Sequence, residues 1–335
     1  MAYIYKKIVE GKPYYYLRIS ERVKSRVISK DIAYLGTDPN KIESKLEELP
    51  KKYAKDIRKA YRNIQKFVIS ERLLNKVKGN KMKSVPFLTR DILEEIESIK
   101  LHYNQYFLKE NPLTIKEVYK EFLIDFAYNT TSMEGNTITL KETEKLLQEN
   151  LTPKNRTLRE IYDLQNTEKV FFEILDSNKQ ITHDFIIWIH DNLMENIDNR
   201  KGYRIGESRV ARARFKSTPA KYVKADMGIL LKWYKKNKKK IHPLALASIF
   251  HQKFERIHPF SDGNGRTGRI LVLYILMRLG YSPVIIHKKN RSLYLDALSK
   301  GDKVDLDKID EKAFTPIVEF VSGEVIGSYW NYFLV

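Results

Sequence analysis

From about residue 87 to the end of the chain, apolar residues recur at intervals of three and four, and this spacing constrains the fold more than any other feature. It is the period of a helix with one buried face. Most interruptions contain Pro, Gly, Asn or Asp, which favour turns and helix ends. We therefore expect a mainly α fold with an all-helical core. The predicted helices are 88–109, 114–132, 139–149, 156–177, 182–195, 224–237, 243–257, 266–279, 291–299 and 314–333.

The first 85 residues follow a different pattern. Residues 14–20 and 27–35 are rich in aromatic and β-branched side chains, which favours two strands of a hairpin. Residues 40–78 have helical spacing, and a linker rich in Gly, Asn and Pro follows them. The sequence thus predicts a small α+β N-terminal module (residues 1–85, a β-hairpin plus helices) and a helical domain (86–335).

The positive charge of the chain is unevenly distributed. Lys and Arg number 61 against 42 Asp and Glu, a formal net charge of +19. Residues 51–83 alone contain 12 Lys and Arg but 2 Asp and Glu. Such a block attracts polyanions, so nucleic acid is a candidate partner for residues 51–83. The alternative is a solvated helix face.

Several classes of protein are excluded or disfavoured by composition. The chain has no cysteine, so disulfides, thiolate metal sites and cysteine nucleophiles are excluded. No apolar run follows the charges near the N-terminus, and the longest strongly apolar run, Ile270–Met277, has eight residues. A bilayer-spanning helix needs about 20. We expect a soluble, cytoplasmic protein with no membrane partner.

The segment 258–269 is the most informative part of the chain. Pro259 ends the helix predicted before it, because proline lacks an N–H donor and disfavours helical geometry at the preceding residue. Gly263, Asn264 and Gly265 then lie at the start of the next predicted helix. Free backbone N–H groups and the positive end of a helix favour bound phosphate, and glycine lets the backbone approach it closely.

Charged side chains surround this turn. Arg266 and Arg269 are suited to phosphate oxygens, and Asp262 is suited to Mg²⁺, which takes one or two carboxylates together with phosphates. His258 is suited to proton abstraction from a hydroxyl. A Gly-Asn-Gly turn alone is weak support, and the spacing does not match a Walker loop. The combination favours phosphate chemistry.

These residues resemble the Fic family motif, His-x-Phe-x-Asp/Glu-Gly-Asn-Gly-Arg-x-x-Arg, at every specified position. The similarity extends over residues 90–330. It implies an all-α core in which the motif lies between two helices. It also implies a protein adenylyltransferase, in which His258 deprotonates a Ser, Thr or Tyr of a target protein and the oxygen attacks the α-phosphate of ATP.

The resemblance implies roles for the rest of the motif and for two other regions. It places Asp262 on Mg²⁺, Gly263–Gly265 with the Asn264 side chain around the phosphates, and Arg269 on the γ-phosphate, while Arg266 assists. Residues 202–219 look like the family's flap, a hairpin that aligns the target by strand pairing. The implied target-binding residues are Val210, Ala211 and Arg212, and the implied further nucleotide contacts are Asn290 and Tyr294.

A second motif precedes the first. Residues from Thr130 through Glu134 to Gly135 look like the family's inhibitory motif, Ser/Thr-x-x-x-Glu-Gly/Asn. The resemblance implies that the helix at 114–132 is inhibitory and that Glu134 pairs with Arg269. The alternative is that Glu134 is simply a carboxylate at a turn.

Other functions stay open at this stage. Some Fic family members use UTP or CDP-choline as donor, and the death-on-curing toxins phosphorylate their targets with a loop that lacks Gly-Asn-Gly. A nucleic-acid-binding regulator with a vestigial Fic core is a further alternative, which the intact His258 and Asp262 disfavour. A C-terminal apolar stripe fits either the core or a homodimer face. Its residues are Ile317, Phe320, Val321, Val325, Ile326, Tyr329 and Phe333.

Overall fold

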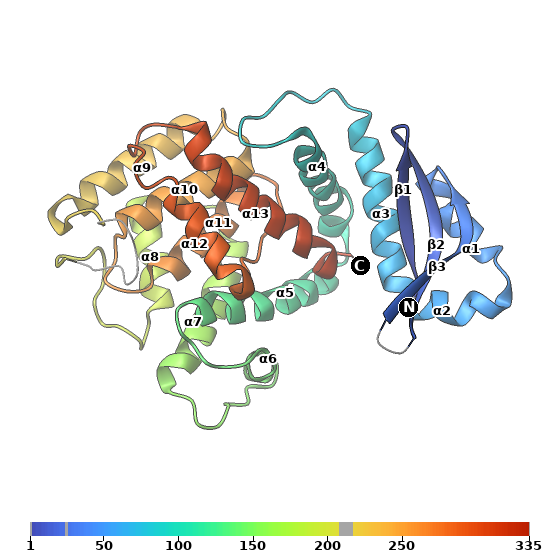
Figure 1. Ribbon diagram of the computed structural model, residues 1–335. Coiled ribbons are helices and arrows are strands. Elements are labelled where there is room, and N and C mark those ends of the chain that lie inside the picture. The colour runs from blue at the N-terminus through green and yellow to red at the C-terminus, as the bar shows by residue number, and fades with distance from the viewer. Residues whose placement is uncertain (1, 24–25, 208–216, 335) are drawn as a thin grey trace.

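The structure is a computed structural model that describes residues 2–23, 26–207 and 217–334. Figure 1 shows a small sheet with its helices at one end and a larger helical body at the other, with α3 (Tyr61–Lys78) and α4 (Arg90–Gln105) between them. The mainly α fold with an α+β N-terminal part is as predicted.

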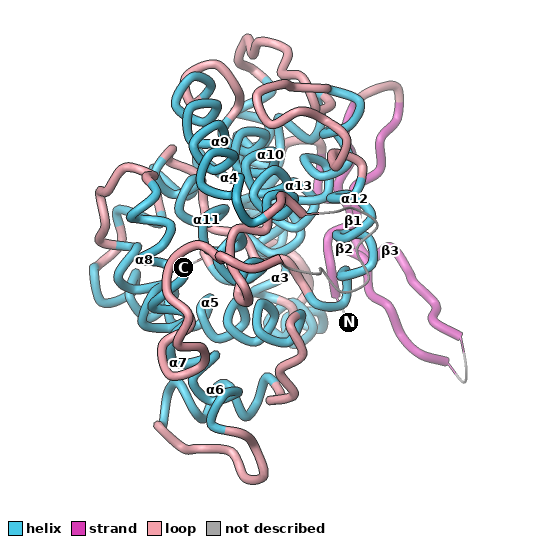
Figure 2. Tube along the Cα trace, turned by 90° about the vertical axis from the view of Figure 1, so that its left-hand side faces the viewer, coloured by secondary structure: helices cyan, strands magenta, loops and turns pink. Residues whose placement is uncertain are grey.

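The sheet is antiparallel, and in the described part of the chain it has the order β1-β2-β3. The predicted hairpin corresponds to β2 (Lys12–Val23) and β3 (Arg26–Gly36), and β1 (Ala2–Val9) adds a strand that the sequence analysis did not separate. Glu10 and Gly11, both with positive φ (48° and 77°), form the tight turn between β1 and β2. Figure 2 shows the β2–β3 hairpin projecting away from the helices.

Alternate residues of the sheet face its helices. Tyr15, Leu17 and Leu35 are fully buried in a hydrophobic cluster with side chains of the helices. The helical elements that close this cluster are η1 (Pro39–Lys41), α1 (Ile42–Glu47), η2 (Lys51–Tyr53), α2 (Ala54–Lys59) and α3. Inside the contact between α3 and the sheet, Glu71 accepts hydrogen bonds from Lys6 (2.8 and 2.7 Å) and from the Tyr15 hydroxyl (2.8 Å).

Helix α3 connects this module to the helical body. It packs along α4, and Lys66 donates a hydrogen bond to Asn331 near the C-terminus (2.6 Å). Lys78 lies 3.9 Å from Glu94 on α4. Part of the basic block 51–83 is therefore engaged within the molecule, and its binding of nucleic acid stays a prediction.

The helical body contains each helix that the sequence predicted there, with ends that differ by a few residues. Side-chain caps explain several starts: Thr139 and Thr157 each form a capping box with the Glu three residues later. The elements after α4 are η3 (Phe107–Lys109), α5 (Pro112–Met133), α6 (Leu140–Glu149), α7 (Leu158–Leu175), α8 (His183–Leu193), η4 (Ala220–Tyr222), α9 (Val223–Asn237), α10 (Pro243–Ile257), α11 (Asn264–Arg278), η5 (Lys288–Asn290), α12 (Arg291–Ser299) and α13 (Glu311–Tyr332).

Helix α11 forms the centre of this body. It contacts α10, α8, α5 and α7, and Ile270 through Leu276 are buried on all sides. It meets α10 at Gly268, where a Cβ atom would lie 2.7 Å from His251 and from Glu255. A side chain at this position would force the two helices apart. The loop between α10 and α11 is thus held between two rigid, closely packed elements.

The C-terminal apolar stripe lies mainly in the core. Ile317, Val321, Val325, Tyr329 and Phe333 on or next to α13 are all at most 3% exposed. These five of the seven stripe residues therefore belong to the core, and a homodimer stays a prediction. Separately, none of the helices in the described ranges combines the length and apolar character needed to cross a membrane.

Replacing Glu71 should weaken the contact between α3 and the sheet. In Glu71→Ala the Tyr15 hydroxyl is left buried without its acceptor and Lys6 loses its partner, so the free energy of unfolding should fall by about 1–3 kcal/mol. Urea denaturation measures the change. Glu47→Ala on the exposed side of α1 serves as the matched control. Equal stability of the two variants would contradict the assigned role of Glu71.

Candidate active site

The loop 258–263 takes its shape from left-handed residues at both ends. His258 caps α10 with φ 52° and ψ 61°, and its N–H donates to Phe254 O (3.0 Å). Gly263, with φ 76°, precedes the first residue of α11. A Cβ at Gly263 would lie 2.7 Å from Met194 Sδ, so this position needs glycine for both space and backbone conformation.

Asn264 and Phe260 close the loop on itself. The Asn264 side chain accepts from Phe260 N–H and donates to Phe260 O, both at 2.9 Å. The Phe260 ring is fully buried and stacks on His190 with ring centroids 3.7 Å apart. The amide of Asn264 therefore faces the loop backbone in this structure, and Phe260 fixes the loop to α8.

His190 on α8 is a supporting residue to which the sequence analysis gave no role. Its Nε2 lies 3.1 Å from Asp262 O, and its Nδ1 lies 2.8 Å from a carboxylate oxygen of Asp191. Asp191 in turn accepts from Gly202 N–H (3.2 Å). The main chain at Asp262 is thus held from α8 by a hydrogen-bonded pair of side chains.

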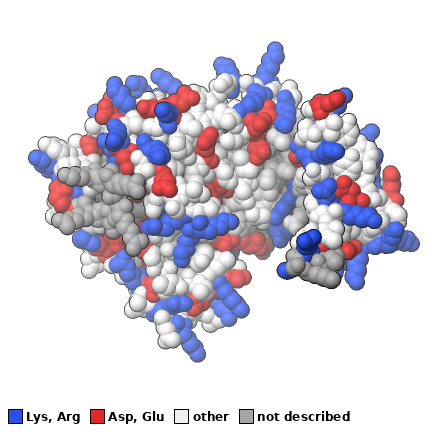
Figure 3. All heavy atoms as spheres, in the orientation of Figure 1, with Lys and Arg blue, Asp and Glu red and all other residues white. Residues whose placement is uncertain are grey.

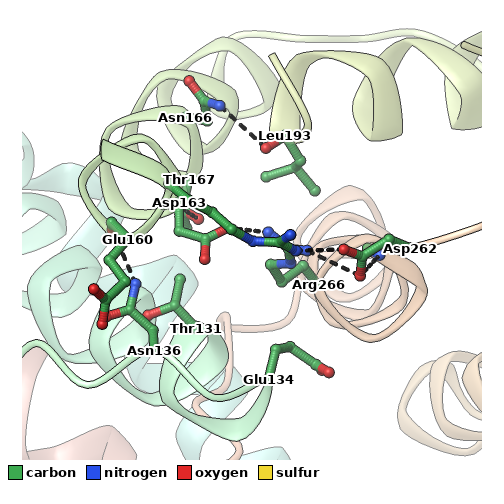
Figure 4. A network of polar contacts seen from close by, with 12 residues as sticks. Thr131, Glu134, Asn136, Glu160, Asp163, Asn166, Thr167, Leu193, Asp262 and Arg266 are labelled. Carbon is green, nitrogen blue, oxygen red and sulfur yellow. Dashed lines mark hydrogen bonds and ion pairs between the residues drawn. The ribbon is translucent and has the colours of Figure 1, made fainter. Parts of the chain in front are cut away.

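Arg266 lies between two carboxylates, as Figure 4 shows. Its guanidinium is ion-paired with Asp163 on α7 and lies 3.4 Å from Asp262, and its side chain is 2% exposed. Asp262 also pairs with Arg159 and accepts from Gly263 N–H (2.6 Å). Burial opposes ionisation of Asp262, but Arg266 and Arg159 outweigh it and keep its pKa below the ordinary value. Arg266 therefore orients an ionised Asp262.

Arg269 is held by the end of α5. Its Nε donates to Thr130 Oγ1 (2.7 Å), and one terminal nitrogen donates to Thr130 O (2.9 Å) and to Glu134 Oε1 (2.7 Å). Glu134 ends α5, and Gly135 follows with φ 105°. Burial disfavours the ionised carboxyl of Glu134, but Arg269 more than offsets this and lowers its pKa.

The N-terminus of α11 faces this carboxylate. Among the described residues, no side chain caps the helix. A Cβ at Gly265 would collide with Glu134 Oε1, so the carboxylate lies directly against the backbone of the first turn. Backbone N–H groups and the helix dipole favour an anion at this position. The carboxylate of Glu134 is located where that anion would be.

His258, at the start of the loop, has a neutral imidazole near pH 7. Burial, together with nearby Arg204, lowers its pKa to about 4. Arg204 is buried and connects two segments: its Nε donates to His258 O (2.8 Å) and its N–H to Pro259 O (2.9 Å). It also donates to the carbonyls of Gly206 (3.0 Å) and Thr218. The two ends of the segment that resembles a flap are therefore fastened to the loop.

The structure brings most of the predicted site residues together. The group comprises His258, Asp262, Gly263, Asn264, Gly265, Arg266, Arg269, Thr130, Glu134 and Gly135. Tyr294 is buried behind the loop, where its hydroxyl lies 2.5 Å from His251 Nε2, and Asn290 donates instead to Glu324 on α13 (2.6 Å). Val210, Ala211 and Arg212, together with the centre of the predicted flap hairpin, lie outside the described residues.

The supporting residues missed by the sequence analysis are Arg159, Asp163, His190 and Arg204. Arg159 and Asp163 are four residues apart on one predicted helix, which places them on the same face. Nothing in the sequence links that face to a loop about a hundred positions later. The only sequence feature that could have indicated a role for Arg159 and Asp163 was that two charged residues share one face of a predicted amphipathic helix.

The chain is also similar to known proteins. Residues 180–276 match the Fic/DOC family. The chain is 30% identical over 224 residues to the protein adenylyltransferase Fic of Aedes aegypti, covering 64% of this chain and 42% of that protein. It is 26% identical over 250 residues to the protein adenylyltransferase Fic of Nematostella vectensis, covering 73% of this chain and 57% of that protein.

A solved structure is also similar. A Fic domain containing signaling protein from Bacteroides thetaiotaomicron matches with a TM-score of 0.63 and 27% sequence identity, covering 71% of this chain and 94% of that chain. The chain spans less than two thirds of the length of both relatives named above.

The ion pair between Asp163 and Arg266 should be important for stability. Asp163→Asn leaves a buried guanidinium without its main partner, which should lower the free energy of unfolding by about 3–5 kcal/mol. Chemical denaturation followed by circular dichroism measures the loss. Glu173→Gln, on the exposed face of the same helix, should change it by less than about 0.5 kcal/mol. An Asp163 variant as stable as this control would show that Arg266 does not need Asp163.

Proposed function

We propose that this chain, which is similar to Fic/DOC family proteins over residues 180–276, is a protein adenylyltransferase that transfers AMP from ATP to a Ser, Thr or Tyr hydroxyl of a target protein and of itself. One observation carries the proposal. A neutral histidine, an ionised aspartate and a helix N-terminus without a side-chain cap lie together on the single loop between α10 and α11.

The residues around α11 are suited to a nucleotide with its metal ion. The Glu134 carboxylate already lies against the backbone of the first turn at Gly265, which supports an anion-binding role for this position. Arg269 is the cation closest to that anion and would bind the γ-phosphate in its place. Asp262 has a side chain that is 38% exposed and would hold Mg²⁺, which neutralises part of the phosphate charge when bound.

His258 would act as the general base. Because its pKa is lowered to about 4, the imidazole is neutral near pH 7 and able to accept a proton. The hydroxyl oxygen of the target forms a bond to the α-phosphorus of ATP, the bond from that phosphorus to the pyrophosphate oxygen breaks, and the hydroxyl proton moves to His258. The products are the AMP-modified protein and pyrophosphate.

Glu134 would keep the enzyme inactive. While its carboxylate is bound to Arg269, the cation for the γ-phosphate is already paired, and negative charge stands at the N-terminus of α11. ATP that binds in this state would be shifted, with its α-phosphate out of line with the target hydroxyl. A misplacement of about 1 Å can cost on the order of 10²-fold in rate.

Removal of the base should abolish transfer. In a Glu134→Gly background, His258→Ala should lower the rate of AMP transfer from α-labelled ATP by about 10²- to 10⁴-fold, because proton abstraction is lost. ATP binding, measured by titration calorimetry, should change little. With His258 intact, the rate should fall only as the pH approaches about 4, where the imidazole becomes protonated. Turnover close to that of the parent in the His258 variant would exclude this base.

Removal of the inhibitory carboxylate should activate the enzyme. Glu134→Gly should raise labelling of the protein itself and of targets by about 10²-fold, because Arg269 becomes free for phosphate. Arg269→Ala should not have this effect, since it removes the phosphate ligand together with the inhibitory contact.

The matched control is Glu121→Ala, which removes an exposed carboxylate from the same helix α5. It should label like the wild type. Equal labelling of the wild type and Glu134→Gly would contradict the inhibitory role. Labelling that persists in Glu134→Gly/His258→Ala would contradict the catalytic role as well.

A further inference from the structure

The N-terminal sheet carries a row of tyrosines on the face opposite its helices. Tyr5 on β1 pairs directly with Tyr16 on β2, and Tyr16 pairs directly with Tyr34 on β3. Neighbouring strands are about 4.8 Å apart, so directly paired residues on one face form a continuous line across the sheet. The three residues therefore lie side by side across all three strands of the described sheet.

Further side chains extend this row. The ring centroids of Tyr16 and Tyr34 are 5.3 Å apart, and those of Tyr14 and Tyr34 are 6.3 Å apart. The guanidinium of Arg18 lies over the Tyr5 ring, 3.6 Å from its centroid. Tyr34 is 50% exposed and the other rings are partly exposed. We call Tyr5, Tyr14, Tyr16, Arg18 and Tyr34 the tyrosine platform.

Packing within the molecule does not account for the platform. The hydrophobic cluster of the module uses the alternate residues, such as Ile4, Tyr15 and Leu17, which face the helices. Within the described ranges, the platform tyrosines are members of neither that cluster nor its surrounding partly buried residues. A contiguous group of exposed or partly exposed aromatic rings on a protein surface commonly marks an interaction site.

The segment that forms the sheet has an excess of positive charge. Residues 1–36 contain eight Lys and Arg against three Asp and Glu. Lys45 Nζ lies 5.7 Å from the centroid of the Tyr34 ring. Figure 3 shows Lys and Arg side chains, with Asp and Glu among them, over the module at the right-hand side of the molecule. The ligand that such a surface attracts is an anion with flat, stackable groups.

We propose that the tyrosine platform binds single-stranded nucleic acid. Each base of a single strand offers an open π-face that can stack on a tyrosine ring or on a guanidinium plane, and the phosphates meet the surrounding cations. In a duplex the bases already stack on one another, and their faces are not available to the platform. The inferred site is distinct from residues 51–83, which offer charge without this aromatic row.

The test uses the full chain and fluorescein-labelled oligonucleotides: a 12-mer of U, a 12-mer of dT and a 12-base-pair duplex. The wild type should bind the single strands more tightly than the duplex at equal salt. Tyr16→Leu and Tyr34→Leu should each weaken single-strand binding by roughly 5- to 150-fold, since one stacking partner is lost. Tyr16→Phe and Tyr34→Phe retain the ring and should bind within about twofold of the wild type.

A charge variant distinguishes stacking from general attraction. Lys55→Ala/Lys59→Ala removes two exposed cations of the 51–83 block and should weaken duplex and single strands alike, leaving the preference for single strands intact. Any of three results would overturn the proposal: no single-strand binding by the wild type at low salt, equal affinity for duplex and single strands, or Leu variants that are folded by circular dichroism and bind like the wild type. Preference between the U and dT oligomers identifies RNA or DNA as the ligand.

Discussion

Two buried guanidinium groups on the first two turns of α11, those of Arg266 and Arg269, determine how the helical body is assembled. A buried arginine must have its hydrogen bonds and charge satisfied, because an unpaired charge in the interior costs several kcal/mol. Arg266 takes its partner from α7, at Asp163, and Arg269 takes its partners from α5, at Thr130 and Glu134. The need to pair these two arginines thus fixes the positions of α7 and α5 relative to α11.

The same requirement links structure to regulation. If the proposed function is right, the partner of Arg269 is exchanged during activation, from the carboxylate of Glu134 to a phosphate group. The exchange is possible because Glu134 lies at the end of α5, next to Gly135 with its positive φ, and not in the middle of a helix. Arg266 has no comparable freedom. Both side chains of its ion pair with Asp163 are buried, which suits a residue that holds the loop and Asp262 in place.

The N-terminal module has a separate hydrophobic cluster and joins the body through α3 and a few polar contacts, such as Lys66 with Asn331. This organisation leaves the outer face of the sheet free for a partner without any change at the loop between α10 and α11. The tyrosine platform at one end and the proposed phosphate-binding loop at the other can therefore act independently.

The sequence by itself determined the helices of the body, because the periodicity, caps and breakers that define a helix are local properties. It also determined the loop 258–269, because all the candidate chemical groups of this loop lie within twelve consecutive residues. It left β1 unresolved, since an edge strand with adjacent Lys6 and Lys7 has weak alternation. Only the tertiary structure decided that Arg266 faces Asp163, that Asn264 closes on Phe260 and that His190 supports Asp262. These contacts join residues on different elements or depend on the rotamer of one side chain. Local periodicity in the sequence does not indicate which buried polar groups will form a hydrogen bond or ion pair with each other.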